Sequence, residues 1–284
     1  MSYAQRAISV IFAKAGKTPI RFDGLQCSAV VNMAGGTQAS AAMELRVWGM
    51  TLSQMNELSS AGAQMVAVSN DTVTLLAGDV NGNQFNVFEG TMFRAFMDFS
   101  AIPDVAFVVS AVAGLYQKSV PIAPRTYAGA QFAENIIESL AQSIGFSFVN
   151  DSGAHAVLRD QYTYGSAIDQ IKTVANAAGI PVEIANNTVT IWPNDGFRDQ
   201  TIIDIGPGNG LVGYPTYYEA GFIVRSEFNP AIAMGRQIRL KSSIPKANGT
   251  WPVQTVTHEL FTQQEDGPWF TTTRLAPSPY VANN

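Results

Sequence analysis

The sequence contains few side chains that could act in nucleophilic or general acid–base catalysis. It has two histidines, His155 and His258, and one cysteine, Cys27. His155 lies in a predicted loop. His258 lies in a predicted strand beside Glu259, and neighbouring residues of a strand point to opposite faces. No serine stands in a G-x-S-x-G arrangement, and Cys27 has no partner nearby in the sequence. The pattern therefore predicts no nucleophile activated by a base.

Acidic residues offer a different chemistry, because two carboxylates roughly 5–10 Å apart in space can hydrolyse a glycosidic bond. Sequence spacing does not identify such a pair. Glu134, Asp160 and Glu259 are the candidates if the protein is a cell-wall hydrolase. A chain with 22 acidic residues contains pairs at this separation by chance, so the pattern favours no enzyme.

One glycine-rich stretch matches the G-x-G-x-x-G pattern of dinucleotide sites. Gly208, Gly210 and Gly213 supply the three glycines. In such a site the last glycine opens a helix whose N-terminus faces the pyrophosphate. Here Tyr214 and Pro215 follow at once, so no such helix is expected. We interpret the stretch as a loop between strands.

A second stretch, DVNGNQFNVFEG, partly matches a calcium-binding loop. Asp79, Asn81 and Asn83 occupy the first, third and fifth positions. The glycine required at the sixth position is Gln84, and the bidentate glutamate required at the twelfth is Gly90. Because both defining positions fail, we expect a polar hairpin, and the sequence predicts no metal, cofactor or catalytic site.

The chain is poor in charge. Charged residues make up 14% of it, against about 25% in a typical globular protein. Depletion of charge is a mark of interface cores, which favours large surfaces buried against partner proteins over a sheet protein covered by neutral polar groups. The net charge is −5, and the densest basic stretch holds only Arg236, Arg239 and Lys241. Stable binding of nucleic acid is therefore not expected.

Cellular context follows from what the sequence lacks. A single cysteine cannot form an internal disulfide, and a buried Cys27 would behave as a small hydrophobic residue. We find no secretory signal and no window of about 18 apolar residues that could span a membrane. We expect a soluble protein made in a cytoplasm.

The predicted elements fall into three segments. Residues 1–118 alternate as strands, for example AISVIFA and MELRVWGM, with one short helix that Thr51 caps. The stretch 119–127 contains two prolines and is predicted to be a linker. Residues 119–199 then form a small α+β module, with one helix that ends at Gly145 and one that runs from Ser166 to Gly179. A hairpin follows around Asn186-Asn187.

Residues 200–284 return to strands bounded by prolines, which suggests a barrel or sandwich with an extended tail PSPYVANN. Aromatic residues gather in this segment. They are either core residues or interface anchors, two alternatives that the sequence leaves open: Tyr214, Tyr217, Tyr218, Phe222, Phe228, Trp251, Trp269 and Phe270.

The stretch GLVGYPTYYEAGFIVRSEFNPAIAMGRQIRLKSS, followed by VQTVTHELFT and WFTTTRLAP, resembles the C-terminal region of the baseplate hub proteins of contractile-tailed bacteriophages. The stretches MELRVWGMTLSQMNEL and NVFEGTMFRAFMDFSAIPDVAFVVSA resemble the first domain of that family. The similarity covers most of the chain and is a pattern of turns and strands.

This resemblance implies a mainly β fold in which two tube-like β-barrel domains, 1–118 and 200–284, flank the α+β module 119–199. It implies a homotrimer whose ring adapts the six-fold tail tube to the three-fold central spike, beside other baseplate proteins, in a virion assembled in the host cytoplasm. DNA would pass through the lumen without stable binding. Some related hubs carry a fused lysozyme, for which this chain has no room. A tail-tube subunit and a peptidoglycan-degrading hydrolase are the alternatives.

The resemblance also assigns structural roles to seven residues. Gly213, Pro215 and Thr216 are expected to shape a turn before a strand of the last barrel. A corner leading into RQIRLKSS is expected to contain four more residues: Phe228, Asn229, Pro230 and Gly235. Proline fixes its own φ and lacks a donor, and glycine permits a tight reversal.

Overall fold

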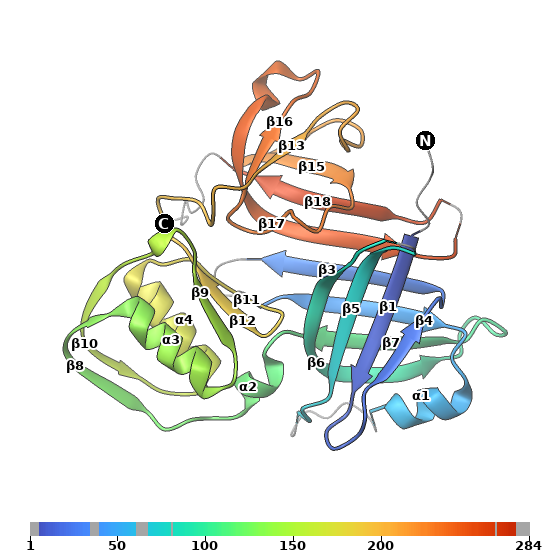
Figure 1. Ribbon diagram of the computed structural model, residues 1–284, viewed down its shortest axis with the longest axis horizontal. Coiled ribbons are helices and arrows are strands. Elements are labelled where there is room, and N and C mark those ends of the chain that lie inside the picture. The colour runs from blue at the N-terminus through green and yellow to red at the C-terminus, as the bar shows by residue number, and fades with distance from the viewer. Residues whose placement is uncertain (1–5, 35–39, 61–67, 81, 265, 277–284) are drawn as a thin grey trace.

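The computed structural model describes residues 6–34, 40–60, 68–80, 82–264 and 266–276 (Figure 1). The fold is mainly β, as predicted, and most neighbouring strands pair antiparallel. The predicted tail 277–284 and Asn81 of the predicted hairpin turn lie outside the described residues.

In its described residues, the first segment has seven strands and two short helices. They are β1 Arg6–Ala13, β2 Ile20–Asp23, β3 Cys27–Ala34, β4 Ala42–Trp48, α1 Leu52–Leu58, β5 Thr72–Asp79, β6 Gln84–Asp98, β7 Ala106–Val112 and α2 Leu115–Ser119. The predicted cap of α1 is confirmed: the N–H of Gln54 donates to the Thr51 hydroxyl, and the Gln54 side chain bonds back to the Thr51 backbone N–H.

The middle segment packs two helices against short strands. They are β8 Arg125–Phe132, α3 Ala133–Ser143, β9 Ser147–Asn150, β10 Val157–Thr163, α4 Ala167–Ala178, β11 Val182–Ala185 and β12 Thr188–Ile191. Ser166 caps α4 and Gly179 ends it at φ 64°, as predicted. The predicted linker is partly wrong, because β8 begins at Arg125 and pairs with β10, a partner distant in sequence.

The last segment consists of β13 Ile202–Ile205, β14 Thr216–Tyr218, β15 Gly221–Glu227, β16 Gln237–Leu240, β17 Gly249–Phe261 and β18 Trp269–Leu275. One long sheet path joins it to the first segment, in the order β14-β15-β18-β17-β3-β4-β7-β6-β5-β1-β2, with β16 and β13 extending from β17. In Figure 1, β17 of the last segment lies beside β3 of the first.

The predicted closed barrels are not found in the described residues. A barrel in the first segment would require the edge of β3 to meet β2. That edge of β3 is instead occupied by β17, with Val31 opposite His258. β2 therefore has β1 as its only strand partner within the described part of the chain, and β14 at the other end has only β15.

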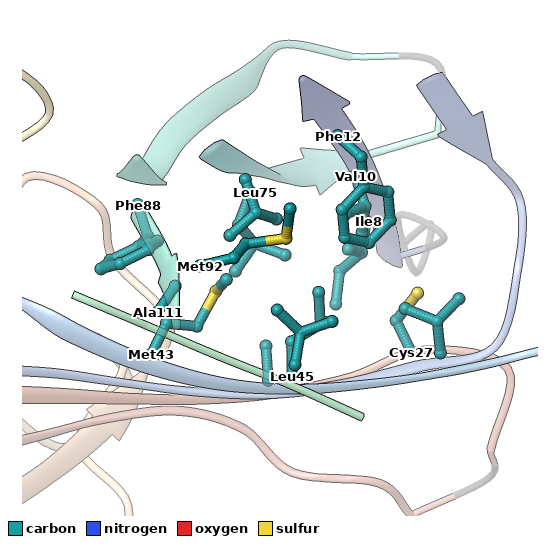
Figure 2. Packing of buried hydrophobic residues seen from close by; sticks show 14 of the residues in the cluster. Ile8, Val10, Phe12, Cys27, Met43, Leu45, Leu75, Phe88, Met92 and Ala111 are labelled. Atoms are coloured by element: carbon teal, nitrogen blue, oxygen red, sulfur yellow. The ribbon is translucent and has the colours of Figure 1, made fainter. Parts of the chain in front are cut away.

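Three separate groups of buried residues form the core. In the first segment, Ile8 and Val10 of β1 and Leu75 of β5 lie across from Met43 and Leu45 of β4 (Figure 2). A second group packs α3 and α4 onto β11 and β12. A third lies among β13, β15, β16, β17 and β18. The first and last segments thus share a sheet, but each has its own group of buried residues. Leu260 of β17 is part of the first group, and Phe228 and Trp269 pack against it.

Candidate interaction surface

Eight consecutive strands, from β14 to β6, form one layer with two unlike faces. Alternation along each strand sends one set of side chains into the cores and the other set outward. We call the outward set the polar face. Its charged members are Glu44, Arg46, Glu89, Arg94, Asp98, Arg225, Glu227, Glu259 and Arg274.

Two ion pairs cross the polar face, and each spans a middle strand. Arg46 of β4 reaches over β7 to Asp98 of β6 at 3.2 Å. Arg225 of β15 reaches over β18 to Glu259 of β17, also at 3.2 Å. Hydrogen bonds from Ser100, and then the Arg46 guanidinium, hold the pKa of Asp98 below its usual value. Both pairs are largely exposed, so each contributes little to stability.

The strands that carry these pairs follow the same order in both segments. In the first segment, β4 pairs with β3 and β7, and β6 pairs with β5 and β7. In the last segment, β15 pairs with β14 and β18, and β17 pairs with β16 and β18. All eight pairings are antiparallel, so the order β3 to β7 matches the order β14 to β18 strand by strand. β6 and β17 are the long strands of their segments. Within its own segment, each pairs with the third strand of the order along its first half and with the fifth along its second half. β1 and β13 differ, because β1 pairs with β5 antiparallel and β13 with β16 parallel.

A shared irregularity fixes the correspondence residue by residue. The β6–β7 ladder shifts register between Met92 and Arg94, and the β17–β18 ladder shifts between Val253 and Thr255. When these bulges are matched, Asp98 corresponds to Glu259. The pairing of β7 with β4 and of β18 with β15 then makes Arg46 correspond to Arg225. The two ion pairs therefore occupy the same position in each segment.

Gly213, Pro215 and Thr216 lie at one end of the layer. Gly213 has φ 71°, Pro215 is buried, and Thr216 begins β14, the edge strand of the sheet. Beside them Tyr214 and Tyr217 are 74% and 55% exposed, whereas Phe222 is buried against Trp251. The aromatic residues of this segment thus divide between surface and core.

Phe228, Asn229 and Pro230 form the turn that leaves β15. The Phe228 ring packs edge-on against His258 and Trp269, and the Asn229 N–H donates to the Thr271 hydroxyl. Pro230 lines a cavity of about 250 Å³, the junction cavity, to which all three segments contribute.

Gly235 lies apart from that turn and contacts the middle segment. Its φ is +79°, its N–H donates to Val253, and its carbonyl accepts from the Arg198 N–H. A Cβ at this position would lie 2.7 Å from the Trp192 ring, which is fully buried. Glycine is therefore required here both by the backbone conformation and by space.

Arg198 is a residue that the sequence analysis missed. Its guanidinium donates to Glu183 at 2.5 Å and to Asp151 at 3.1 Å, and also to the Thr190 hydroxyl. Burial opposes its charge, but the two carboxylates hold the pKa of Arg198 above its usual value. Nothing near Arg198 in the sequence signals this network, because Glu183 and Asp151 come from other elements of the middle segment.

His258 and Cys27 are both buried. The Thr271 hydroxyl lies 2.9 Å from His258 Nδ1, and burial lowers the pKa of His258 to about 4. Cys27 packs into the first core as the sequence predicts, and burial raises the pKa of its thiol to about 12. A thiol with this pKa carries almost no thiolate at neutral pH, so it is a poor nucleophile.

The three candidate carboxylates of the hydrolase alternative each have a structural partner. Glu134 lies 2.6 Å from His155 Nδ1, Asp160 accepts from the Gly129 N–H, and Glu259 pairs with Arg225. They come from α3, β10 and β17.

The two loops that partly matched ligand motifs have other roles. Gly208 and Gly210 lie in a turn followed by β14 rather than a helix, and Asp79 and Gln84 flank the β5–β6 hairpin. Within the described residues, no group of three or more His, Cys, Asp or Glu side chains could hold a metal ion. No helix of that part of the chain is long and apolar enough to cross a membrane.

Comparisons with known proteins address this fold directly. A family described as baseplate hub gp41 matches residues 28–274. No curated protein matches the sequence. Among solved structures, the 43 kDa tail protein of prophage MuSo2 from Shewanella oneidensis is similar at a TM-score of 0.62 and 8% identity, over 95% of this chain and 98% of that one.

Two further structures share the fold. A tail protein from Neisseria meningitidis has a TM-score of 0.61 at 10% identity, covering 96% of each chain. An Escherichia coli component of the type VI secretion system, described as structurally similar to the T4 bacteriophage tail proteins gp27 and gp5, has a TM-score of 0.59 at 11% identity. That match covers 94% of this chain and 76% of the other.

Proposed function

The chain belongs to the baseplate hub gp41 family, and from this premise we propose that it is a structural, non-enzymatic hub of a contractile phage tail. Three copies form a ring that meets the six-fold tail tube on one side and the three-fold central spike on the other, among other baseplate proteins. The ring belongs to the virion and assembles in the host cytoplasm.

The observation that carries this proposal is the repeated strand order, with the Arg46–Asp98 and Arg225–Glu259 ion pairs at matching positions. It supports a chain built from two similar β units, 1–118 and 200–284, with the α+β module 119–199 inserted between them. Three such chains supply six similar units, which is the number that a six-fold tube requires. The two units are open sheets joined edge to edge rather than separate closed barrels.

The polar face is the proposed wall of the channel. It spans both units without interruption from β14 to β6. Arginines do not outnumber acidic side chains on it, and two of the arginines are already paired with carboxylates. A surface with no excess of positive charge releases few counterions from a phosphate backbone, so DNA would pass along it without being held.

The ring is tested by the mass of the purified protein in solution, measured by light scattering after size exclusion, and by electron microscopy of the same fractions. We expect a trimer whose averaged images are hollow and three-fold symmetric. A protein that stays monomeric with and without tail-tube protein, or that forms six-fold rings and filaments, would refute the adaptor and in the second case favour a tail-tube subunit.

The absence of hydrolytic activity is part of the proposal. Glu134, Asp160 and Glu259 each hold a structural contact. A gel containing peptidoglycan should show no cleared band where the refolded protein migrates, beside a lysozyme control that clears. A cleared band that disappears on Glu134→Gln would contradict this part and favour the hydrolase.

A further inference from the structure

One pair of strand edges joins the two units within the chain. Inside the chain, the edge of β17 pairs with β3, with Val30 opposite Glu259, Val31 opposite His258 and Asn32 opposite Thr257. In the strand correspondence, β6 takes the place of β17 and β14 takes the place of β3. The matching edges of β6 and β14 have no strand partner within the described residues.

The correspondence specifies which residues would meet. On β6, Phe96, Met97 and Asp98 match Thr257, His258 and Glu259, because the bulges of the two ladders coincide. On β14, Thr216, Tyr217 and Tyr218 match Val30, Val31 and Asn32. That match follows from the pairing of β14 with β15 and of β3 with β4.

From this correspondence we propose that β14 of one copy pairs antiparallel with the second half of β6 of the next copy, with Tyr217 opposite Met97. The inference rests on the proposed ring and names the edges that close it. Thr216 then lies opposite Asp98, and Tyr218 lies opposite Phe96.

Hydrogen bonding at the β6 edge fits this register. The Ala95 N–H donates to the Ser60 hydroxyl at 3.0 Å, and the Ser60 N–H donates to the Ala95 carbonyl at 2.9 Å. These bonds mark the side to which Ala95 directs its backbone groups, and Met97, two residues on, directs its own groups to the same side. At the internal joint the residues matching Ala95 and Met97 are Val256 and His258, and both lie opposite β3 residues.

Ser60 also sets where the contact ends. Its hydrogen bonds already satisfy the backbone N–H and carbonyl of Ala95. In the proposed register the residue opposite Ala95 would be Glu219, which lies one residue beyond the end of β14. A strand that ends at Tyr218 therefore fits beside Phe96, Met97 and Asp98 without displacing Ser60. The short length of β14 and the position of Ser60 agree independently with the register.

One competing edge is β2, at the far end of the sheet path from β14. Its outer residues Arg21 and Asp23 bond to each other and to Ser9 and Gln84. Charged side chains on a short strand are a common protection against edge pairing. β2 also lies outside the eight-strand layer that carries the polar face, so a joint there would interrupt that face.

A disulfide between copies tests the register. Tyr218 and Phe96 would form a non-hydrogen-bonded antiparallel pair, whose Cα atoms lie about 4.5 Å apart, within disulfide range. The variant carrying Tyr218→Cys and Phe96→Cys should give covalent dimers and trimers on oxidation, which a reductant converts back to monomer. The native Cys27 is 1% exposed and provides an inert background.

The matched control carries Tyr218→Cys and Arg21→Cys, which places the second thiol on β2. It should give no covalent trimer. A trimer by light scattering that links through Arg21→Cys, or that does not link through Phe96→Cys, overturns the edge assignment and leaves the ring intact. A monomer at every concentration overturns the ring itself, and the edge assignment with it.

A second pair of variants does not depend on oxidation. Tyr217→Pro removes the outward N–H of the central pair, and proline is tolerated on an edge strand. Tyr217→Val restores the residue type found at the matching Val31 and keeps the N–H. We expect the proline variant to lose the trimer with an unchanged far-UV spectrum, and the valine variant to retain it. A proline variant that remains trimeric contradicts the proposal.

Discussion

Replacing Gly235 with alanine should destabilise the protein through two separable effects. The first is conformational, because a φ of +79° costs a residue with a Cβ about 1–2 kcal/mol. The second is steric. The new Cβ would lie 2.7 Å from Trp192 Cε2 and 3.0 Å from Arg198 Cβ. Trp192 is fully buried and cannot move aside into solvent, so overpacking adds about 1–3 kcal/mol.

Gly208 offers a matched control for the conformational effect. Its φ is also +79°, and a Cβ there would meet nothing within 4 Å. Gly208→Ala should therefore cost about 1–2 kcal/mol, and Gly235→Ala about 2–5 kcal/mol. The difference between the variants, about 1–3 kcal/mol, measures the steric contact with Trp192 and Arg198, since both variants gain the same restriction of the unfolded chain.

The measurement is urea denaturation of both variants at one protein concentration, followed by tryptophan fluorescence and by far-UV circular dichroism. Fluorescence is informative because Trp192 lies at the site of the clash. We expect the midpoint of Gly235→Ala to fall well below that of Gly208→Ala, with equal slopes. Equal midpoints would refute the reasoning, since they would show that the ring of Trp192 yields at no cost.

Three further predictions follow from the buried and capped groups. The pKa of His258 is about 4 in the folded protein and 6.5 in the unfolded chain, so the contribution of its neutral ring to stability is complete above pH 6.5 and is lost as the pH falls toward 4. Near pH 5, wild type should have lost about 2 kcal/mol more stability than His258→Gln in thermal melts, and an identical pH dependence of the two proteins would contradict this. Arg198→Ala removes the guanidinium that pairs with the buried Glu183 carboxylate and with Asp151, and it should lower the free energy of unfolding by about 3–5 kcal/mol in a denaturant titration. A double variant that also carries Glu183→Gln should lose less, because it leaves one fewer carboxylate unpaired. Thr51→Ala removes the cap of α1 and should cost about 1 kcal/mol in the same assay, and a Thr51→Ser variant that loses as much would contradict the capping role.

Local features of the fold were predictable because they depend on residues close in sequence. Ser166 and Gly179 bound α4, and Thr51 begins α1, since side-chain capping and the left-handed conformation of glycine act within one turn. Asn186 and Asn187 reverse the chain between β11 and β12 for the same reason. The mainly β fold followed from alternation along single strands.

The joining of the two ends was not predictable from such patterns. Val31 meets His258 across more than two hundred residues, and nothing local selects that register over a closed barrel. The same limit explains the error at Arg125, whose strand exists only through its partner β10. The correspondence of Asp98 with Glu259 required the matched bulges, which leave no signature in residue type.

The pairing of β3 with β17 has a consequence for how a ring of three chains could assemble. Of the six joints between neighbouring units in such a ring, half would lie within a chain and form during folding. The two edges of such a joint are linked covalently, so their effective concentration is higher than the concentration of separate chains in solution. Only the joints between chains would then depend on encounter, and each would meet an edge already held in shape by a completed neighbour. Dilution would in that case separate the ring into pairs of units and leave every pair whole.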